Sequence, residues 1–243
     1  YKRQHFLPQF LPVPGPADHK YTRGVVALAT GSEAYPGAAL LGAQVATRCG
    51  VGMVRYAGPG GVAGMVVQRV PEVVPAPGRA QVWVLGSGWD VSSPETEADA
   101  AERFMETTSF AAETSADAFF VLDAGVLQLI EGFADGAEHA ILTPHAGEAN
   151  ALLTRLDVRP RNGEWSRERI ESEPVTAATA LAELTHATVI LKGHTTVVAA
   201  PGEETITIVA PTARLATAGT GDVLAAMVGA VLALNHASIH AAA

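Results

Sequence analysis

The chain has 243 residues, a formal net charge of −9 and 48% hydrophobic residues, so it can bury one substantial core and is predicted to form a single α/β domain. The acidic balance and the lack of a basic run exclude a nucleic-acid-binding surface, and the single cysteine, Cys49, excludes an intrachain disulfide. Every apolar run is too short to span a membrane, and the start of the chain is too rich in proline for a signal peptide, so we expect a soluble cytoplasmic protein.

The N-terminal segment has no periodic pattern. Its first sixteen residues contain four prolines, which favour extended backbone. We therefore predict an extended arm over residues 1–17 that wraps a surface or a neighbouring subunit, followed by one domain over residues 18–243. The chain ends on SIHAAA, which contains no helix stop signal, so we expect it to be cut short there or to lack residues.

After the arm, apolar runs of strand length alternate with helical patterns. The predicted strands are Val25–Ala29, Val51–Ala57, Val82–Leu85, Phe119–Leu122, Ala140–Leu142 and Val189–Leu191. The predicted helices are Gly37–Arg48, Gly147–Leu156, Val175–His186 and the apolar stretch that follows Gly221. This alternation predicts a mostly parallel sheet with helices on both faces. Thr195–Ala199 and Thr205–Val209, joined through Pro201 and Gly202, are predicted to form a late antiparallel hairpin.

Ligands of such sheets gather beyond the carboxyl ends of the strands, so the loops at these ends are candidate binding sites. The loop over residues 29–39 contains Gly31 and leads into a helix that opens with small residues, which would let a bulky ligand lie on the helix end. An ordinary strand-to-helix loop explains the same residues. The turn from Gly86 through Gly88 to Trp89 and Asp90 lies at another strand end, and the sequence alone leaves its role open.

The segment Gly58–Ala63 matches the G-x-G-x-x-A form of a dinucleotide-binding fingerprint. The acidic residue required roughly twenty positions later is absent, because that region reads Pro-Ala-Pro-Gly-Arg. We therefore interpret the segment as a tight connection. The chain contains no P-loop pattern, so any bound phosphate must be held by another architecture.

Two further strand ends contain a histidine and a lysine. His145, in Leu-Thr-Pro-His-Ala-Gly-Glu, is placed by Pro144 in the loop before a helix, where it either caps the helix or touches a substrate. Lys192, in Val-Ile-Leu-Lys-Gly-His-Thr-Thr, is predicted to extend its ammonium group from the sheet edge toward a phosphate. Asp123 also ends a strand, and we interpret it as the cap of a helix that begins at Ala124.

The segment ATAGTGDVLAAMVGAVLAL combines a Gly-Thr-Gly-Asp turn with an apolar helix. Gly219, Thr220 and Gly221 form a predicted phosphate-binding turn, because glycine amides and the positive end of a helix dipole attract anions. Asp222 fits two roles: a structural cap of the helix, or a functional group beside the phosphate that acts as a base or holds a metal. From the motif alone the two roles stay equally open.

Taken in order, these segments resemble the ribokinase-like superfamily and, more closely, the ADP-dependent NAD(P)H-hydrate dehydratases, which are related to the C-terminal half of bifunctional nicotinamide-nucleotide repair proteins. The resemblance covers residue 18 to the end and rests on HKYTRGVVALATGSEAYPGAALLGAQVATRCGVGMVRYAGP, LTPHAGEANALL, VILKGHTT and LATAGTGDVLAAMVGAVLA. It implies a ribokinase-like fold and a lyase reaction of metabolite repair. The S epimer of NADHX or NADPHX, the hydrated nicotinamide cofactors, is restored to NADH or NADPH while ADP or ATP is hydrolysed.

The resemblance also implies roles for particular residues. Asp222 would be the catalytic base. The substrate-binding residues would be Ala38, Ala39, Gly88, His145 and Asp222, and the nucleotide-binding residues Lys192, Gly193, His194, Thr195, Thr196 and Gly221. Mg²⁺ is expected to share the stabilisation of the phosphoryl group, without an assigned ligand, and a homotetramer is what the family suggests.

The chain departs from the family pattern at a few positions. It has Ala218 where a glycine is usual, Ser87 between Gly86 and Gly88 where a proline is usual, and Gly125 where an Asp is common. We expect Ala218 to leave the anion site intact and Trp89 to narrow the cofactor cleft. The alternative functions are a ribokinase-like kinase of a vitamin alcohol, a nucleotide-binding module without turnover, and a dehydrogenase.

Overall fold

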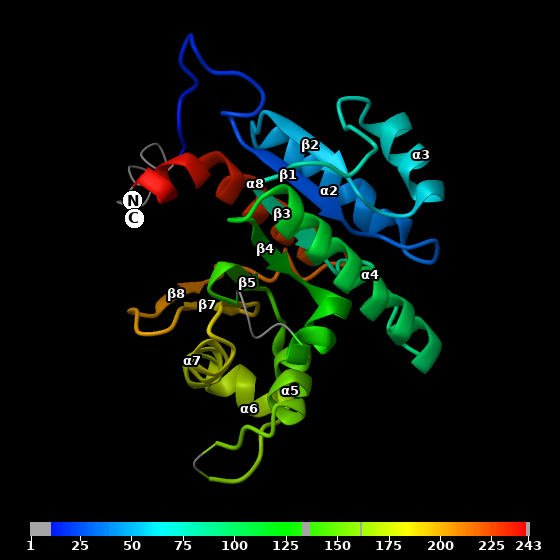
Figure 1. The fold of residues 1–243 in the computed structure, drawn as a ribbon. Helices are drawn as coiled ribbons and strands as arrows, with labels where there is room; N and C mark the ends of the chain where they lie inside the picture. Colours follow the sequence, from blue (N-terminus) through cyan, green and yellow to red (C-terminus); the bar gives the residue numbers. More distant parts are fainter. Residues whose placement is uncertain (1–10, 133–136, 161, 242–243) are drawn as a thin grey trace.

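A computed structural model of the chain describes residues 11–132, 137–160 and 162–241. Within these residues, eight strands form one sheet in the order β2-β1-β3-β4-β5-β6-β7-β8 (Figure 1). The strands are β1 (Val25–Ala29), β2 (Met53–Tyr56), β3 (Val82–Leu85), β4 (Phe119–Leu122), β5 (Ala140–Leu142), β6 (Thr188–Leu191), β7 (Thr195–Ala199) and β8 (Ile206–Val209). The pairs from β2 to β6 are parallel, whereas β7 is antiparallel to both β6 and β8.

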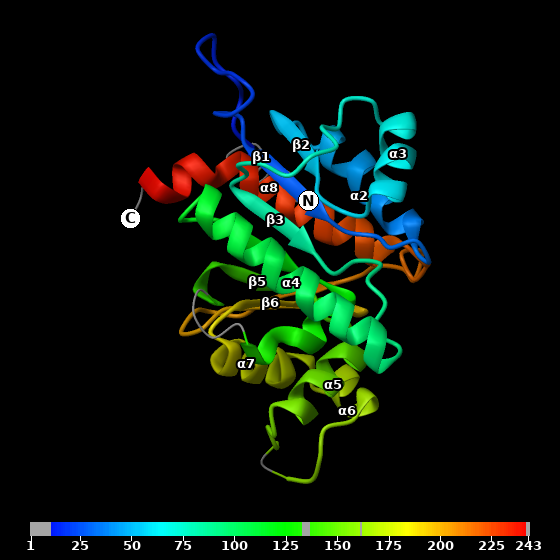
Figure 2. The ribbon, with the colours of Figure 1, turned by 45° about the vertical axis from the view of Figure 1, so that its right-hand side comes forward.

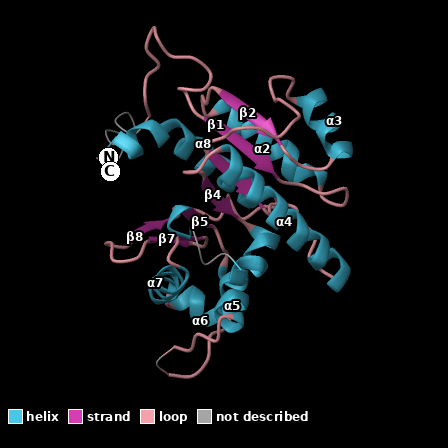
Figure 3. Ribbon diagram, viewed as in Figure 1, coloured by secondary structure: helices cyan, strands magenta, loops and turns pink. Residues whose placement is uncertain are grey.

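Helices connect the parallel strands and cover both faces of the sheet (Figure 3). The α-helices are α2 (Pro36–Arg48), α3 (Gly60–Arg69), α4 (Pro94–Thr114), α5 (Ala146–Arg155), α6 (Arg167–Ser172), α7 (Pro174–Thr185) and α8 (Thr220–Ala241). Two 3₁₀ segments, η2 (Ala124–Gly132) and η3 (Ala137–His139), lie between β4 and β5. The chain thus has the mostly parallel, helix-covered sheet with a late antiparallel hairpin that the sequence predicts.

Two buried clusters form the core, one on each face of the sheet. Figure 2 shows α2 and α8 on one side of β3 and α4 on the other. On the first side Val26, Val82 and Val84 pack with alanines of α2 and α8, and on the second side Trp83 and Leu85 pack with Phe104 of α4. The central parallel strands β1, β3 and β4 are buried on both faces because βαβ crossovers place helices there, which explains their continuous apolar sequences.

Most of the predicted elements are confirmed, with bounds that shift by one or two residues. The structure also contains three α-helices that the sequence did not predict: α3, α4 and α6. The first ten residues of the predicted arm lie outside the described residues, and residues 11–17 are exposed and belong to no helix or strand. The division into an arm and a domain stays a prediction.

The segment Gly58–Ala63 leads from β2 directly into α3, so its glycines belong to a short connection and a first helical turn. Among the described residues, no helix has the length and apolar composition needed to cross a bilayer.

Candidate active site

Five loops meet at the carboxyl edge of the parallel strands. The end of β6 is joined to that of β5 by a backbone bridge between His145 and Lys192, in which the Lys192 N–H donates to the Pro144 carbonyl at 2.8 Å. The Gly31 N–H after β1 donates to the Ser87 carbonyl after β3 at 2.7 Å. Because parallel strands all end on one side of the sheet, segments far apart in the sequence lie together here.

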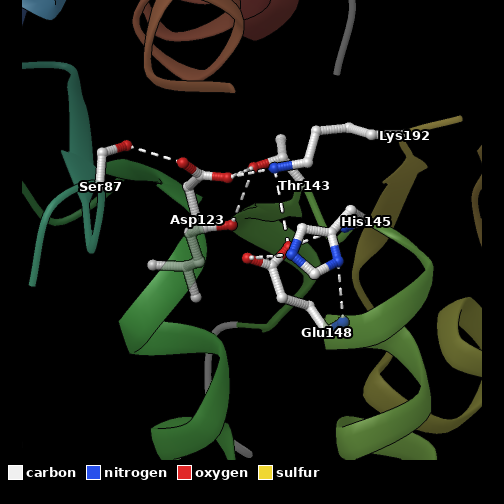
Figure 4. A network of polar contacts seen from close by, with 7 residues as sticks. Ser87, Asp123, Thr143, His145, Glu148 and Lys192 are labelled. Carbon is white, nitrogen blue, oxygen red and sulfur yellow. Dashed lines mark hydrogen bonds and ion pairs between the residues drawn. The ribbon is translucent and has the colours of Figure 1, made fainter. Parts of the chain in front are cut away.

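A buried carboxylate lies at the centre of this edge (Figure 4). Asp123 is 1% exposed, and its Oδ2 accepts a hydrogen bond from the Ser87 hydroxyl at 2.8 Å. Its Oδ1 accepts from the Thr143 hydroxyl at 2.8 Å and from the Lys192 ammonium at 2.7 Å. The donors follow β3, β5 and β6, so one carboxylate links the ends of three other strands.

The interpretation of Asp123 as a helix cap is wrong. Residues 124–132 form a 3₁₀ segment, and both carboxylate oxygens of Asp123 accept hydrogen bonds from side chains of other loops. A buried charge is retained at low cost only when it is paired and hydrogen-bonded, and the three donors meet that requirement.

His145 is the N-cap of α5, which confirms one of its two predicted roles. Its Nδ1 accepts a hydrogen bond from the Glu148 N–H at 3.1 Å, and Glu148 Oε2 accepts from the His145 N–H at 2.7 Å. The side chain of His145 is nevertheless 59% exposed, at the carboxyl edge. The cap therefore fixes the position of the ring without removing it from solvent, and contact with a substrate stays a prediction.

Lys192 lies between the carboxylates and the start of α8. Its Nζ is 2.7 Å from Asp123 Oδ1 and 3.7 Å from Glu148 Oε2, and its side chain is 18% exposed. A Cβ built on Gly221 would lie 3.4 Å from the same Nζ. The ammonium group thus reaches the sheet edge, as the sequence predicts, although carboxylates surround it there.

The Gly-Thr-Gly-Asp segment forms the start of α8. Gly219 has a φ of +85°, a conformation that glycine adopts without steric cost, and its carbonyl accepts from the Val223 N–H at 3.1 Å. Because α8 begins at Thr220, Asp222 is its third residue and not its N-cap, so the cap interpretation of Asp222 is wrong. Amide groups of such a first turn have no partners within the helix and attract anions.

Asp222 is half-buried, and its carboxylate accepts no hydrogen bond from the described residues. Burial, first, and the negative charge of Asp123, second, raise the pKa of Asp222 above its ordinary value, while the positive charge of Lys192 opposes the shift. A carboxylate that is shielded from water and has no hydrogen-bond donor is more basic than an exposed one, which suits proton abstraction.

Small residues at the start of α2 lie against the turn after β3. A Cβ built on Gly88 would lie 2.7 Å from the Ala38 methyl group, and one on Gly31 would lie 2.8 Å from the Ala39 methyl group. Ala38 is 7% exposed and Ala39 is fully buried. A ligand at this place would therefore meet the backbone of the helix end and of the Gly88 turn more than these methyl groups.

Trp89 does not line a cleft, so the prediction that it narrows the cofactor site is wrong. Its side chain is 6% exposed, its Nε1–H donates to the Ala29 carbonyl at 2.8 Å, and the guanidinium of Arg103 lies 4.3 Å from its ring centroid. Arg103 also donates to the Gly31 carbonyl at 3.0 Å. Burial lowers the pKa of Arg103 to about 10. Trp89 and Arg103 thus hold the end of β1 and the loop that follows it through hydrogen bonds to two backbone carbonyls.

The other residues that the resemblance assigns to the nucleotide lie on the hairpin between β6 and β7. Gly193 and His194 are exposed at its tip, and Thr195 and Thr196 begin β7 beside β8. Lys192, which precedes these residues in the chain, has its ammonium group beside the first turn of α8.

Sequence reasoning missed four polar residues of this edge: Ser87, Asp123 in its observed role, Thr143 and Glu148. A signal is present in the sequence, since each of these residues follows an apolar run of strand length or lies at the start of the next helix. Polar residues at these positions are expected near a ligand site in parallel sheets.

A family model described as NAD(P)H-hydrate dehydratase matches residues 26–243. A bifunctional NAD(P)H-hydrate repair enzyme of Mycobacterium tuberculosis is 39% identical over 241 residues, covering 96% of this chain and 46% of that protein. The ADP-dependent (S)-NAD(P)H-hydrate dehydratase of Neisseria meningitidis is 32% identical, covering 88% of this chain and 71% of that protein. The chain thus spans about half the length of the bifunctional relatives.

Solved structures share the fold. A ribokinase-like superfamily protein of Enterococcus faecalis aligns with a TM-score of 0.73 and 20% identity, covering 92% of this chain and 76% of that one. An ADP/ATP-dependent NAD(P)H-hydrate dehydratase of Bacillus subtilis, co-crystallised with ATP and Mg²⁺, aligns with a TM-score of 0.72 and 24% identity, covering 100% of this chain and 87% of that one. The fold is therefore ribokinase-like, and, because the family model matches nearly the whole chain, this protein belongs to the NAD(P)H-hydrate dehydratase family.

Proposed function

We propose that this chain dehydrates the S epimer of NADHX or NADPHX to NADH or NADPH at the expense of ADP or ATP. Membership of the family and the names of the relatives support the reaction class. The observation that carries the proposal is the position of Asp222. This carboxylate lies in the first turn of α8, next to Gly221, which faces the ammonium of Lys192, and it is free of hydrogen bonds from the described residues.

In the proposed mechanism the terminal phosphate of the nucleotide lies at the first turn of α8. Asp222 removes the proton from the ring hydroxyl of the hydrate, and the hydroxyl oxygen attacks that phosphorus, releasing AMP when the nucleotide is ADP. The C–O bond of the phosphorylated hydrate then breaks as the neighbouring ring carbon loses a proton to water; phosphate leaves, and the double bond of the dihydronicotinamide is restored. Lys192 and the free amides of α8 stabilise the negative charge of the transferring group.

Mg²⁺ is proposed to arrive with the nucleotide. Among the described residues no group of three or more His, Cys, Asp or Glu side chains gathers as a metal site. The oxygens of Asp123 already accept from three donors. Mg²⁺ commonly keeps several waters and binds substrate phosphates with few protein ligands, so the described residues fit an ion held mainly by the nucleotide. Bound there, it would neutralise charge on the phosphates.

The proposed function is tested by mixing the protein with NADHX, Mg²⁺ and either ADP or ATP, and following the absorbance of NADH. We expect recovery of NADH together with release of AMP from ADP. A stable phosphorylated product without NADH would support the kinase alternative instead. Binding of nucleotide without any turnover would support the binding-module alternative, and either outcome would refute the dehydratase.

The pH dependence provides a second prediction. Asp222 must be ionised to act as a base, and its pKa is raised by burial and by Asp123. Activity should therefore fall on acidification with a midpoint above the ordinary aspartate value of about 4. The measurement is kcat/KM against pH, with Asp123→Asn as the comparison. Loss of the second negative charge should move the acid limb to lower pH; a limb at the same pH in both proteins would contradict the assignment.

We also propose a cytoplasmic location and a homotetramer, as the resemblance to the family suggests. Multi-angle light scattering of the purified protein measures the second directly, and a monomeric mass at micromolar concentration would exclude it.

A further inference from the structure

Both carboxylate oxygens of Asp123 accept side-chain hydrogen bonds at the carboxyl edge of the sheet. This carboxylate is buried, it carries no proton-transfer role in the proposed mechanism, and it accepts from Ser87, Thr143 and Lys192 (Figure 4). Placing a charge in the interior of a protein costs free energy, so a buried carboxylate is expected to contribute something to the site that offsets this cost. The contacts of Asp123 indicate two such contributions, one to the position of Lys192 and one to the turn after β3.

The first contribution concerns Lys192. A lysine side chain carries a compact charge on a flexible four-carbon chain, so its ammonium group has no fixed position unless partners restrain it. Here the 2.7 Å ion pair with Asp123 fixes its Nζ, which lies 3.4 Å from the Cβ position of Gly221. The ammonium is therefore held beside the first turn of α8, where the proposed mechanism places the phosphate.

The second contribution concerns the turn after β3. The Ser87 hydroxyl donates to Asp123, and the Ser87 carbonyl accepts from the Gly31 N–H at 2.7 Å. The next residue, Gly88, lies against Ala38 at the start of α2. Asp123 thus restrains the turn that forms the other side of the edge, where the resemblance places the hydrate.

We propose that Asp123 is a positioning residue that holds the Lys192 ammonium at the start of α8 and, through Ser87, holds the Gly88 turn against α2. One carboxylate thereby sets the relative positions of the nucleotide and hydrate halves of the site. The proposal rests on the proposed function for the identity of the two ligands. It assigns no contact between Asp123 and either of them.

The ion pair gives the proposal a distinctive consequence. While Asp123 is charged, it offsets part of the attraction between Lys192 and a phosphate. Asp123→Asn keeps the shape of the side chain and removes that offset, so ADP should bind as tightly as in the wild type or more tightly. The released ammonium would follow the phosphate, and turnover should fall because the reacting groups are no longer aligned.

A double-mutant cycle tests the first contribution. Lys192→Met should raise the Kd of ADP with Mg²⁺ about tenfold or more, since it removes a charge-assisted contact. Asp123→Asn should leave that Kd within about twofold or lower it, while reducing kcat at least about tenfold. In the Lys192→Met background, Asp123→Asn should change kcat by less than about threefold, because coupled residues act non-additively. Calorimetry measures Kd, and recovery of NADH measures kcat.

Ser87→Ala tests the second contribution. It should raise KM for the hydrate severalfold and leave the Kd of ADP unchanged. Thr143→Val removes one donor to Asp123 and keeps both the ion pair and the link to Ser87, so it should lower Tm and reduce kcat less than Asp123→Asn does. Equal losses of kcat in Thr143→Val and Asp123→Asn would indicate a general structural role and refute positioning.

Three other results would overturn the proposal: weaker ADP binding in Asp123→Asn, additive effects in the double variant, or a raised Mg²⁺ requirement, which would make Asp123 a metal ligand. If Asp123→Asn does not fold, Ser87→Ala tests the proposal in its place. An unchanged KM for the hydrate in Ser87→Ala would then refute the link from Asp123 to the Gly88 turn. The ADP-binding arm needs no turnover, so it tests the role of Asp123 even if the wild-type protein produces no NADH and the proposed function fails.

Discussion

Asp222→Asn is expected to reduce kcat by about 10²–10⁴-fold, the usual contribution of a general base, while ADP binding changes little. Asparagine keeps the shape of the side chain and cannot accept the proton. The same substitution is expected to raise Tm at neutral pH. A loss of activity coupled to a gain in stability is typical of a residue that the fold retains for chemistry.

The sign of the stability change follows from the pKa. Burial and Asp123 raise the pKa of Asp222 in the folded state above its value in the unfolded chain. Between these two values the folded protein binds more protons than the unfolded protein, so the free energy of unfolding decreases as the pH rises through that interval. At neutral pH the charged carboxylate therefore destabilises the fold, and a neutral amide removes the penalty.

Asp117→Asn is the matched control, because Asp117 is exposed in the loop before β4. It should leave both kcat and Tm unchanged. Thermal unfolding followed by circular dichroism, combined with the NADH assay, measures both quantities on the same samples. If Asp222→Asn retains activity within tenfold, or if its Tm falls, the carboxylate is a structural group of α8 and the proposed base must be sought elsewhere.

The parallel strands were predictable because helices cover both faces of the sheet there, so each of these strands appears as a short apolar run. Helix α4 was not predicted, although Ser93 and Pro94 give it a capping box and a favourable first residue. Its buried residues are only Ala100, Phe104 and Ala111, so the apolar stripe is too sparse to stand out among its polar residues. Periodicity identifies a helix only when its buried face carries large side chains.

The edge at which the site lies was also predictable, since all parallel strands end on one side. The partners within it were not. Asp123 is 36 residues from Ser87 and 69 residues from Lys192, and they meet only because β3, β4, β5 and β6 are neighbours in the sheet. Strand order is not encoded in local patterns, so Asp123 was assigned the local role of a cap. Trp89 was misplaced for the same reason, because Arg103 of α4 stacks on its ring.

Gly88→Ala is expected to destabilise the protein by about 2–5 kcal/mol and to raise KM for the hydrate at least about tenfold. Gly88 has a φ of +71°, and a Cβ there would lie 2.7 Å from the Ala38 methyl group and 3.0 Å from the Tyr35 carbonyl oxygen. A left-handed conformation costs alanine about 1–2 kcal/mol, and overpacking adds about 1–3 kcal/mol. The added methyl group pushes the turn away from the start of α2.

Gly64→Ala on α3 is the control, because its Cβ would meet nothing within 4 Å and its backbone is helical. It should stabilise the protein by about 0.5–1 kcal/mol, since alanine favours helix over glycine. Urea unfolding measures both changes in stability, and calorimetry measures the Kd of ADP, which should stay within about twofold of wild type in Gly88→Ala because Lys192 and α8 are untouched. The added methyl group contacts α2 and not α8. If Gly88→Ala nevertheless weakens the binding of ADP as much as the binding of the hydrate, the two halves of the edge do not bind separate ligands.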